Sequence, residues 1–233
     1  MKLKTITITT DFGDGFATSQ LHCVLACLNF NGKVIENHDV KPYSIVEGAY
    51  GIWQTSKYCP KGIVHVGIID PGVGSDRVGI VIKTKNFWLV GPDNGLLYPA
   101  AKRDGIKKVW KINNSSFGKI SNTFHGRDIF IKIAAMLANK QNPKDFGCKE
   151  IKTKDLIKLE FQTGQILHID KYGNLKIWGN KTFGLPLVNT FSDVEIGKAL
   201  VLKGSSELLE ICLNQQSARE YFKAELGQIL EKL

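Results

Sequence analysis

The sequence contains no apolar run near the about 18 residues that a membrane-spanning helix requires, so we expect no contact with a membrane. Its start passes directly from Met1-Lys2-Leu3-Lys4 into alternating Thr and Ile, and we expect no signal peptide. Cysteine is sparse: the five residues are odd in number and lack the paired spacing of a zinc site. Cys23 and Cys27 would share one face of a helix, but no nearby pair of ligands completes a tetrahedral set. These absences predict reduced thiols in a cytoplasmic protein that binds no metal.

Several common catalytic signatures are missing as well. There is no Walker loop, no zincin helix and no nucleophile elbow. Gly13-Asp14-Gly15 follows a predicted strand, but Thr18 stands where a dinucleotide fingerprint has its third glycine. The sequence therefore does not favour a nicotinamide cofactor. It also shows no internal repeat and no low-complexity tract.

Positive charge is in excess: 31 Lys and Arg residues against 22 Asp and Glu residues give a formal net charge of +9. Such an excess suggests a nucleic-acid partner. The lysines, however, are spread along the chain, and no basic stretch is interleaved with aromatic residues. We therefore interpret the charge as solvated faces and expect no nucleic-acid partner. A nucleic-acid binder stays as an alternative that salt-dependent retention on DNA would test.

Predicted strands and helices alternate in the first part of the chain. Ser44 and Glu47 have the spacing of a capping box at a helix start, and Thr18 or Ser19 is the candidate N-cap of an earlier helix. Hydrophobic periodicity predicts the order strand 5–10, helix 21–28, strand 34–35, helix 45–53, strand 63–69, hairpin 79–83 and 87–90, strand 106–112 and helix 129–138. This alternation is typical of a layered α/β domain.

The composition changes beyond residue 138. Residues 139–159 are rich in Lys and contain Pro143 and Gly147, which predicts a linker. Short strand-like runs follow at 165–169, 175–178, 199–202 and 208–213, before a predicted closing helix from Ser217 to Leu230. The predicted fold class is α/β: an N-terminal layered α/β domain with a mostly parallel sheet, residues 1–150, and a smaller C-terminal β-barrel domain, residues 151–233.

The stretch from Ile63 to Arg77 contains the strongest candidate for a site. Its first half is apolar and rich in β-branched residues, as in a strand buried on both faces. Asp70 follows that strand, and Pro71 and two glycines then turn the chain sharply. In open α/β sheets, ligands bind beyond the carboxyl ends of the strands. Arg77 could fold back onto Asp70, although an Asp that caps its own turn beside a solvated Arg is the structural alternative.

Polar side chains recur near the ends of other predicted elements: Asp11, Asp14, Asp93, Asn94, His125, Arg127 and Asp128. Each has a structural interpretation. Asp93 and Asn94 could form a turn, and Arg127 and Asp128 could form an ion pair or begin a helix. His125 could be a satisfied structural residue. Taken together, they predict a site built from several loops at strand ends.

Four motifs give the chain a resemblance to a known family. They are Thr10-Asp11-Phe12-Gly13, Asp70-Pro71-Gly72-Val73-Gly74 with Arg77, Pro92-Asp93-Asn94-Gly95, and Phe124-His125-Gly126-Arg127-Asp128. In these residues the sequence closely resembles the S-adenosylmethionine (SAM) hydroxide adenosyltransferases, relatives of the fluorinase and chlorinase enzymes. The likeness continues through Asn37-His38-Asp39, through Asp170-Lys171-Tyr172-Gly173-Asn174 and through residues 205–218. It covers nearly the whole chain in order.

The resemblance implies an N-terminal α/β domain, a C-terminal β-barrel, and a homotrimer that holds SAM between one subunit's N-domain and its neighbour's C-domain. The implied reaction is attack of water or hydroxide on the ribose C5′ of SAM, which yields adenosine and methionine without a cofactor. Asp70, Arg77 and His125 match the family's water-activating triad. In the halogenating relatives, the positions that match Asp70 and His125 look like tyrosines, which favours water here. A halide-using adenosyl transferase and a non-catalytic adenosine- or SAM-binding protein are the alternatives.

The resemblance also implies substrate-binding positions. Asp11 matches a carboxylate that grips the ribose diol, Tyr43 matches an aromatic residue that packs on the ribose, and Phe124 lies beside the reacting carbon. In the C-terminal domain it implies that Asp170 and Ser205 hold the methionine end, and that Tyr172, Asn174 and Glu210 lie around adenine or methionine. The chain departs from the family at three positions that are usually glycine and that are Glu207, Gln215 and Gln216 here.

The chemistry of a sulfonium substrate fits these residues. The leaving group departs as a neutral thioether and needs no acid, so the difficult part is activation of water. A carboxylate paired with a guanidinium stays charged and is a weak base. We therefore expect Asp70 to orient and polarise the water, Arg77 to hold that carboxylate and stabilise developing hydroxide, and His125 to help relay the proton.

Overall fold

In a computed structural model, which describes residues 4–232, the chain divides into two compact units, Met1–Leu159 and Glu160–Leu233. The predicted boundary lies between residues 150 and 151. Strand β7 (Lys149–Ile151) pairs with β6 (Ile106–Lys111), which ties this stretch to the first unit. The segment 139–159, predicted as a linker, thus contributes a strand and short 3-10 turns to the first unit.

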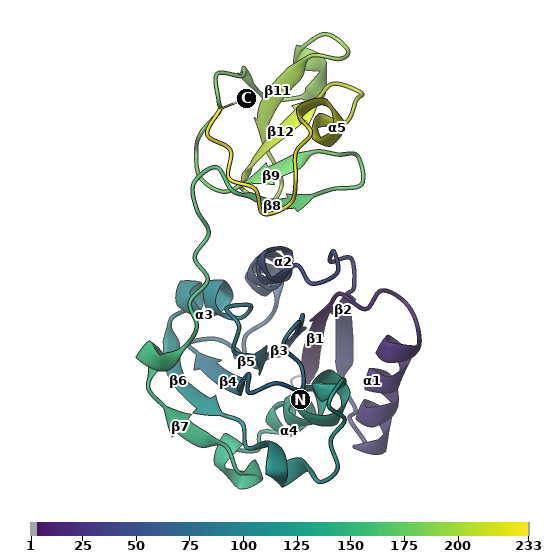
Figure 1. Ribbon diagram of the computed structural model, residues 1–233, viewed down its shortest axis with the longest axis vertical. Helices are drawn as coiled ribbons and strands as arrows, with labels where there is room; N and C mark the ends of the chain where they lie inside the picture. The colour runs from purple at the N-terminus through teal and green to yellow at the C-terminus, as the bar shows by residue number, and fades with distance from the viewer. Residues whose placement is uncertain (1–3, 233) are drawn as a thin grey trace. The chain divides into compact units, whose positions relative to one another are not determined.

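The first unit is built on a seven-stranded sheet in the order β2-β1-β3-β5-β4-β6-β7 (Figure 1). The further strands are β1 (Thr5–Thr10), β2 (Lys33–Asn37), β3 (Val64–Ile68), β4 (Gly79–Thr84) and β5 (Trp88–Pro92). Strands β2, β1, β3 and β5 are parallel, whereas β4, β6 and β7 join by antiparallel pairing. The α/β fold class is confirmed. The sheet is mixed because β4 and β5 form the predicted hairpin.

Helices cover both faces of this sheet. They are α1 (Phe16–Cys27), α2 (Ile45–Tyr58), α3 (Tyr98–Asp104) and α4 (Ile131–Ala138). Helix α4 packs on β1 and β3 beside α1, whereas α2 and α3 pack together on the opposite face (Figure 1). Every residue of β1 and of β3 is buried, which suits the β-branched Thr and Ile residues of β1 and the Val and Ile residues of β3. The layers therefore leave only the strand ends open for a site.

Helix starts follow the sequence in one case and not in another. The Ser44 side chain accepts from the Glu47 backbone N–H at 3.3 Å and caps α2 as predicted. The Glu47 carboxylate reaches back to the Lys41 N–H at 2.7 Å. The predicted N-cap of α1 is wrong: Gly15 is the N-cap, and Thr18 lies inside the helix with its hydroxyl donating to the Gly13 carbonyl.

The second unit contains a five-stranded sheet in the order β10-β11-β12-β9-β8. Its strands are β8 (Ile166–Ile169), β9 (Leu175–Ile177), β10 (Leu187–Val188), β11 (Ala199–Lys203) and β12 (Leu209–Leu213). The predicted helix from Ser217 to Leu230 is wrong in length, because α5 covers only Ala218–Phe222. Lys223 takes a left-handed φ of 50° directly after it and ends the helix. Within residues 4–232, no helix is long and apolar enough to cross a membrane.

Candidate active site

Two loops that follow buried elements bring the predicted triad together. Asp70 lies just beyond β3, and a tight turn with a Val73 N–H to Asp70 carbonyl bond of 3.1 Å returns the chain to Arg77. Gly74 in this turn has a φ of 79°, and a Cβ there would lie 2.2 Å from the Asn122 carbonyl oxygen. Only a glycine at this position lets the Asp70 loop approach the loop that leads to His125.

The three side chains make direct contact. Arg77 donates from Nε to Asp70 Oδ1 at 2.9 Å and from Nη2 to Asp70 Oδ2, which makes the ion pair bidentate. The Nη2 atom also lies 3.0 Å from His125 Nδ1. Bidentate pairing fixes both the position and the plane of the carboxylate. The structure thus places all three residues in the single cluster that the resemblance implied.

The contact with Arg77 determines the protonation of His125. A guanidinium has no acceptor, so His125 Nδ1 must accept this hydrogen bond and the ring proton must be on Nε2. Burial, with the neighbouring Arg77 cation, lowers the pKa of His125 below its ordinary value of 6.5, against the opposing effects of Asp70 and Asp128. His125 is only 5% exposed. It is therefore a neutral hydrogen-bond donor at neutral pH.

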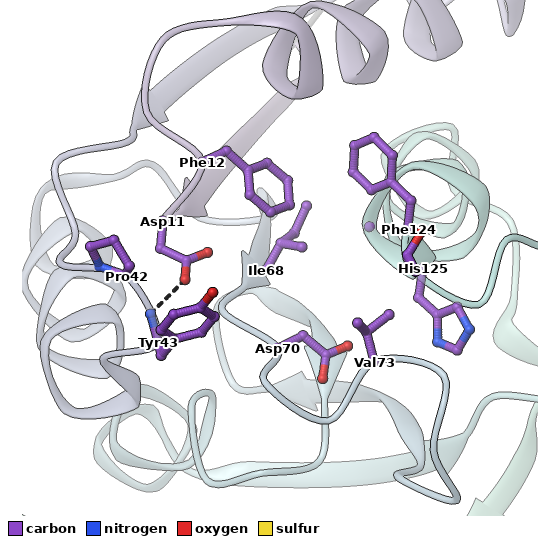
Figure 2. Close-up of a pocket in the computed structure, with 11 residues that line it drawn as sticks. Asp11, Phe12, Pro42, Tyr43, Ile68, Asp70, Val73, Phe124 and His125 are labelled. Carbon is purple, nitrogen blue, oxygen red and sulfur yellow. Dashed lines mark hydrogen bonds between the residues drawn. The ribbon is translucent and has the colours of Figure 1, made fainter.

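A cavity of about 400 Å³ lies against this cluster. Its wall includes Asp70, His125, Asp11, Tyr43 and Phe124 (Figure 2). A volume of this size is typical of a pocket for a small molecule. The structure therefore brings three predicted substrate-binding residues to the same cavity as two members of the triad.

Asp11 and Tyr43 form one side of the cavity. Asp11 follows β1, and its Oδ2 accepts from the Tyr43 backbone N–H at 2.8 Å, as the dashed line in Figure 2 marks. Tyr43 has a φ of 67°, which is unusual for a bulky residue, and its side chain is 76% exposed. The hydrogen bond to Asp11 holds this strained backbone in place beside the cavity.

Aromatic rings form another side. Phe12 and Phe124 meet edge to face with their centroids 5.5 Å apart (Figure 2). The Arg127 guanidinium lies 4.9 Å from the centre of the Phe124 ring. Phe12 and Val73 also line the cavity, although no role was predicted for either residue. Both lie inside the quoted motifs, so their position next to Asp11 and Asp70 was the available signal.

Three other polar residues of the motifs stabilise the loops that carry the triad. Asn94 donates from Nδ2 to the Ile69 carbonyl at 2.9 Å and so holds the peptide just before Asp70. Arg127 donates from Nε to Asp128 Oδ1 at 2.7 Å, and Asp128 accepts from the Ser121 N–H at 2.8 Å. Arg127 and Asp128 therefore form the ion pair that the sequence left open. They stabilise the loop that precedes His125 and the π-helical turn that follows it.

Two further predicted carboxylates, those of Asp93 and Asp14, lie outside the triad. Asp93 is buried, and its Oδ1 accepts from the Ile157 N–H at 3.1 Å. Burial raises the pKa of Asp93, while that hydrogen bond and Arg77 act in the opposite direction. Asp14 is exposed at the loop before α1 and does not line the cavity. Neither residue adds to the triad.

The remaining predicted residues lie in the second unit. Asp170 Oδ1 accepts from the backbone N–H groups of Tyr172 and Asn174, at 2.9 and 3.1 Å, and Oδ2 accepts from Asn174 Nδ2 at 3.0 Å. Asn174 is buried, whereas Tyr172 and Ser205 are exposed. The Asp170 loop is therefore rigidly organised around one carboxylate.

Glu210, like Asn174, is buried. It lies on β12 and pairs with Lys176 at 2.5 Å from Nζ to Oε1. A Cβ at Gly204 would overlap the Glu210 carboxylate, so the glycine makes room for it. Glu207 and Gln215, at two of the positions where the resemblance implied glycine, have left-handed φ values of 68° and 58°. The backbone at these two positions thus keeps a conformation that glycine would adopt without strain.

The residues that the structure describes contain no group of three or more His, Cys, Asp or Glu side chains placed to hold a metal ion. All five cysteines are free thiols.

The fold and the cavity define a two-unit α/β protein with a carboxylate, a guanidinium and an imidazole gathered at a small-molecule site. The chain belongs to the SAM hydroxide adenosyltransferase family: residues 6–147 match the model of its N-terminal domain and residues 164–231 that of its C-terminal domain.

Similar proteins are known from archaea and bacteria. The (R)-S-adenosyl-L-methionine hydrolase of Methanocaldococcus jannaschii is 39% identical over 181 residues, which are 74% of this chain and 66% of that protein. The hydrolase of the same name from Salinispora tropica is 33% identical over 237 residues and 90% of each chain. Among solved structures, an uncharacterized conserved protein from Thermotoga maritima has a TM-score of 0.85 and 25% identity, and the alignment covers 95% of this chain and 97% of that one.

Proposed function

We propose that this chain is an enzyme that hydrolyses SAM to adenosine and L-methionine by attack of water on the ribose C5′. The observation that carries the proposal is the contact of Asp70, Arg77 and His125 at the wall of the cavity of about 400 Å³. Family membership and the names of the curated relatives support it. Because those names specify the (R)-epimer, we propose the same epimer as the substrate here.

The reaction forms one bond from the water oxygen to C5′ and breaks the bond from C5′ to sulfur. The electron pair of the broken bond stays on sulfur, so methionine leaves as a neutral thioether. One proton is released from the water to solvent. Because the developing hydroxide and the sulfonium neutralise each other, a cavity that excludes bulk water favours the transition state.

The contacts within the triad suggest separate roles for its members. Each Asp70 oxygen has a lone pair beyond the one used by Arg77, so the carboxylate can accept a hydrogen bond from the attacking water. Arg77 fixes that carboxylate and adds positive charge where hydroxide develops. His125 Nδ1 is occupied by Arg77, so His125 acts first as a donor through Nε2 and takes a proton only if that contact breaks.

We propose that the other cavity residues hold the nucleoside. Asp11 would accept from a ribose hydroxyl through Oδ1, since Oδ2 already binds the Tyr43 N–H. Tyr43 would pack on the ribose, and Phe124 would lie beside C5′. In the second unit, Asp170 and Ser205 would hold the methionine end, with Tyr172, Asn174 and Glu210 around adenine or methionine.

We further propose a homotrimer in which a neighbouring copy contributes its second unit to each site. The exposure of Tyr43 beside the cavity supports this, because a bulky aromatic residue at a binding site is usually covered when substrate and partner are present. A cytoplasmic location is supported by the five free cysteines, which suit a reducing compartment. We propose that the reaction needs no cofactor, because Asp70, Arg77 and His125 are the groups that activate the attacking water.

The decisive experiment compares the wild type with Asp70→Ala. Purified protein is incubated with (R)-SAM, and adenosine and methionine are separated by chromatography, while binding is followed by calorimetry. We expect adenosine release to fall by at least about 10²-fold with substrate binding retained. Asp76→Ala is the matched control, because Asp76 lies in the same loop but is exposed.

Full activity of Asp70→Ala would refute the assignment of the triad. A parallel incubation of the wild type with chloride tests the halide-using alternative. The presence of Asp70 and His125 disfavours that alternative, and a 5′-chloro nucleoside among the products would contradict our proposal. Tight binding of SAM without any product would identify a non-catalytic binding protein.

A further inference from the structure

A second and larger cavity, of about 800 Å³, lies at the other end of the same sheet. It is lined by residues at the starts of the parallel strands β1, β2, β3 and β5, for example Thr5, Lys33, Ile63 and Trp88. Asp11 and Asp70 follow the ends of β1 and β3. Strand length therefore separates this cavity from the candidate active site, and the proposed reaction makes no use of it.

Charge of one sign gathers at this second cavity. Five of its lining residues are lysines that come from five separate segments: Lys4, Lys33, Lys61, Lys83 and Lys140. Among the described residues that line it, none is Asp or Glu. A concave surface that carries several like charges focuses the electrostatic potential and raises the local concentration of counter-ions. The cavity is thus suited to an anion with several charges.

Two of these lysines contact neutral groups. Lys4 Nζ donates to the Asn139 Oδ1 at 2.6 Å. Lys83 Nζ lies 4.8 Å from the centre of the Trp88 ring, its cross-strand neighbour on β5. Cation–π contact of an exposed lysine is weak, so an anion can draw Lys83 away from the ring at little cost. Trp88 would report such a movement.

We propose that this cavity binds an anion that carries two or more linked phosphate groups. Phosphate oxygens accept short, charge-assisted hydrogen bonds from ammonium groups, and linked phosphates can reach several of the five lysines at once. The same chemistry occurs in inorganic polyphosphate and in the phosphate chain of a nucleotide. The lysines surround a hollow with apolar residues such as Ile35 and Leu137 among its lining, which suits a small ligand rather than an extended nucleic-acid backbone.

Titration of the full-length protein with inorganic tripolyphosphate at constant ionic strength tests the proposal. Calorimetry should give saturable binding, and tryptophan fluorescence should change in parallel. Trp88→Phe should keep the heat of binding and lose most of the fluorescence change. The double variant Lys33→Gln/Lys83→Gln should bind at least about tenfold more weakly, because each substitution removes a charge-assisted contact.

The matched control is Lys149→Gln/Lys203→Gln, which removes the same charge from exposed positions that do not line the cavity. We expect less than about a twofold change in tripolyphosphate affinity for it.

ATP that binds as tightly as tripolyphosphate would indicate recognition of phosphates alone, and tighter ATP binding would indicate a nucleotide; both support the site. Absence of saturable binding, or equal weakening by both double variants, would overturn it, as would binding of a DNA oligonucleotide without binding of tripolyphosphate. These readouts do not depend on SAM hydrolysis.

Discussion

His125 shows how one hydrogen bond can define the chemistry of a residue. Its neutral ring accepts from Arg77 through Nδ1 and therefore presents Nε2–H. If His125 became protonated, Nδ1 would carry a hydrogen and face the Arg77 cation at 3.0 Å. That arrangement is repulsive, which is one of the reasons why the pKa of His125 is lowered. The geometry of the triad is consequently tied to the neutral ring.

This link predicts the pH dependence of the proposed reaction. Since the pKa of His125 lies below its ordinary value of 6.5, the neutral form persists at neutral pH and is lost only in more acidic solution. We expect kcat/KM for SAM to stay level as the pH falls to 6.5 and to decrease at lower pH. The measurement is a pH profile of adenosine formation. In His125→Gln the rate should be lower by about 10²-fold and the acidic decrease should be absent. A decrease that begins well above neutral pH would argue against this role.

Among the elements of the fold, the site depends on two loops that meet at Gly74. The first loop carries Asp70 and Arg77, and the second leads through Asn122 to His125. Gly74 combines a left-handed φ with direct contact to the Asn122 backbone. A side chain at this position would therefore push apart the loops that supply the triad.

We predict that Gly74→Ala lowers the free energy of unfolding by about 2 kcal/mol or more and reduces adenosine formation strongly. Urea unfolding and the chromatographic assay measure the two effects. Gly118→Ala separates the causes: Gly118 has a similar φ of 71°, but apart from its two chain neighbours no described residue has an atom within 4 Å of the place that a Cβ would take. Gly118 has a ψ of −138°, a backbone conformation that is essentially restricted to glycine, so the control should cost about 1 to 3 kcal/mol but leave activity intact. Equal effects of the two substitutions would show that loop contact is unimportant.

The sequence predicted most elements but not all of their ends. The strands were visible in their apolar periodicity, and Ser44 was recognisable as a cap because its partner lies three residues away. The short α5 was not, because residues beyond Lys223 keep an amphipathic composition although the backbone turns away. The start of α1 was not recognisable either, because its N-cap residue, Gly15, has no side chain that forms a capping hydrogen bond. Backbone conformation at such positions is set by tertiary packing.

For the molecule as a whole, His65 contributes to the stability of the first unit. It is fully buried on β3, and its Nδ1 lies 2.6 Å from the Thr7 hydroxyl of β1. Burial, together with Arg103, lowers the pKa of His65 from 6.5 to about 4, against the effect of Asp104. The folded protein therefore holds this imidazole neutral in a range of pH where the unfolded chain would protonate it.

It follows that the folded state loses stability as the pH decreases. The contribution of neutral His65 to the free energy of unfolding is complete above pH 6.5. It is lost progressively toward pH 4, by about 3 kcal/mol in total. Urea unfolding across this range should show a steeper loss in the wild type than in His65→Gln. If that variant does not fold, NMR titration of the wild type gives the answer directly. Titration of His65 near its ordinary pKa of 6.5 would contradict the prediction.

The proposed trimer is also a prediction for the whole molecule. Light scattering of the purified chain should give a molar mass three times 25.9 kDa. A large exposed apolar side chain such as Phe16, at 92% exposure, is a candidate for contact between copies. Phe16→Ser should then weaken the assembly. Tyr58→Ser is the comparison variant, because it changes another exposed aromatic residue, at the end of α2. A monomeric wild type with full activity would contradict the proposal.

Local sequence accounts for the class of the fold, the strand that precedes Asp70 and the motifs that identify the family. These features depend on neighbouring residues, whose periodicity and turn chemistry can be recognised without any knowledge of long-range contacts. Three further features depend on the folded chain: Arg77 meets a histidine 48 residues away, one particular nitrogen of His125 carries the proton, and five separate lysines share one cavity. Such contacts depend on strand order and on the packing of distant loops. Apart from the grouping of the triad, which the resemblance to the family implied, no local pattern in the sequence encodes them, because residues far apart in the chain become neighbours only when the sheet assembles.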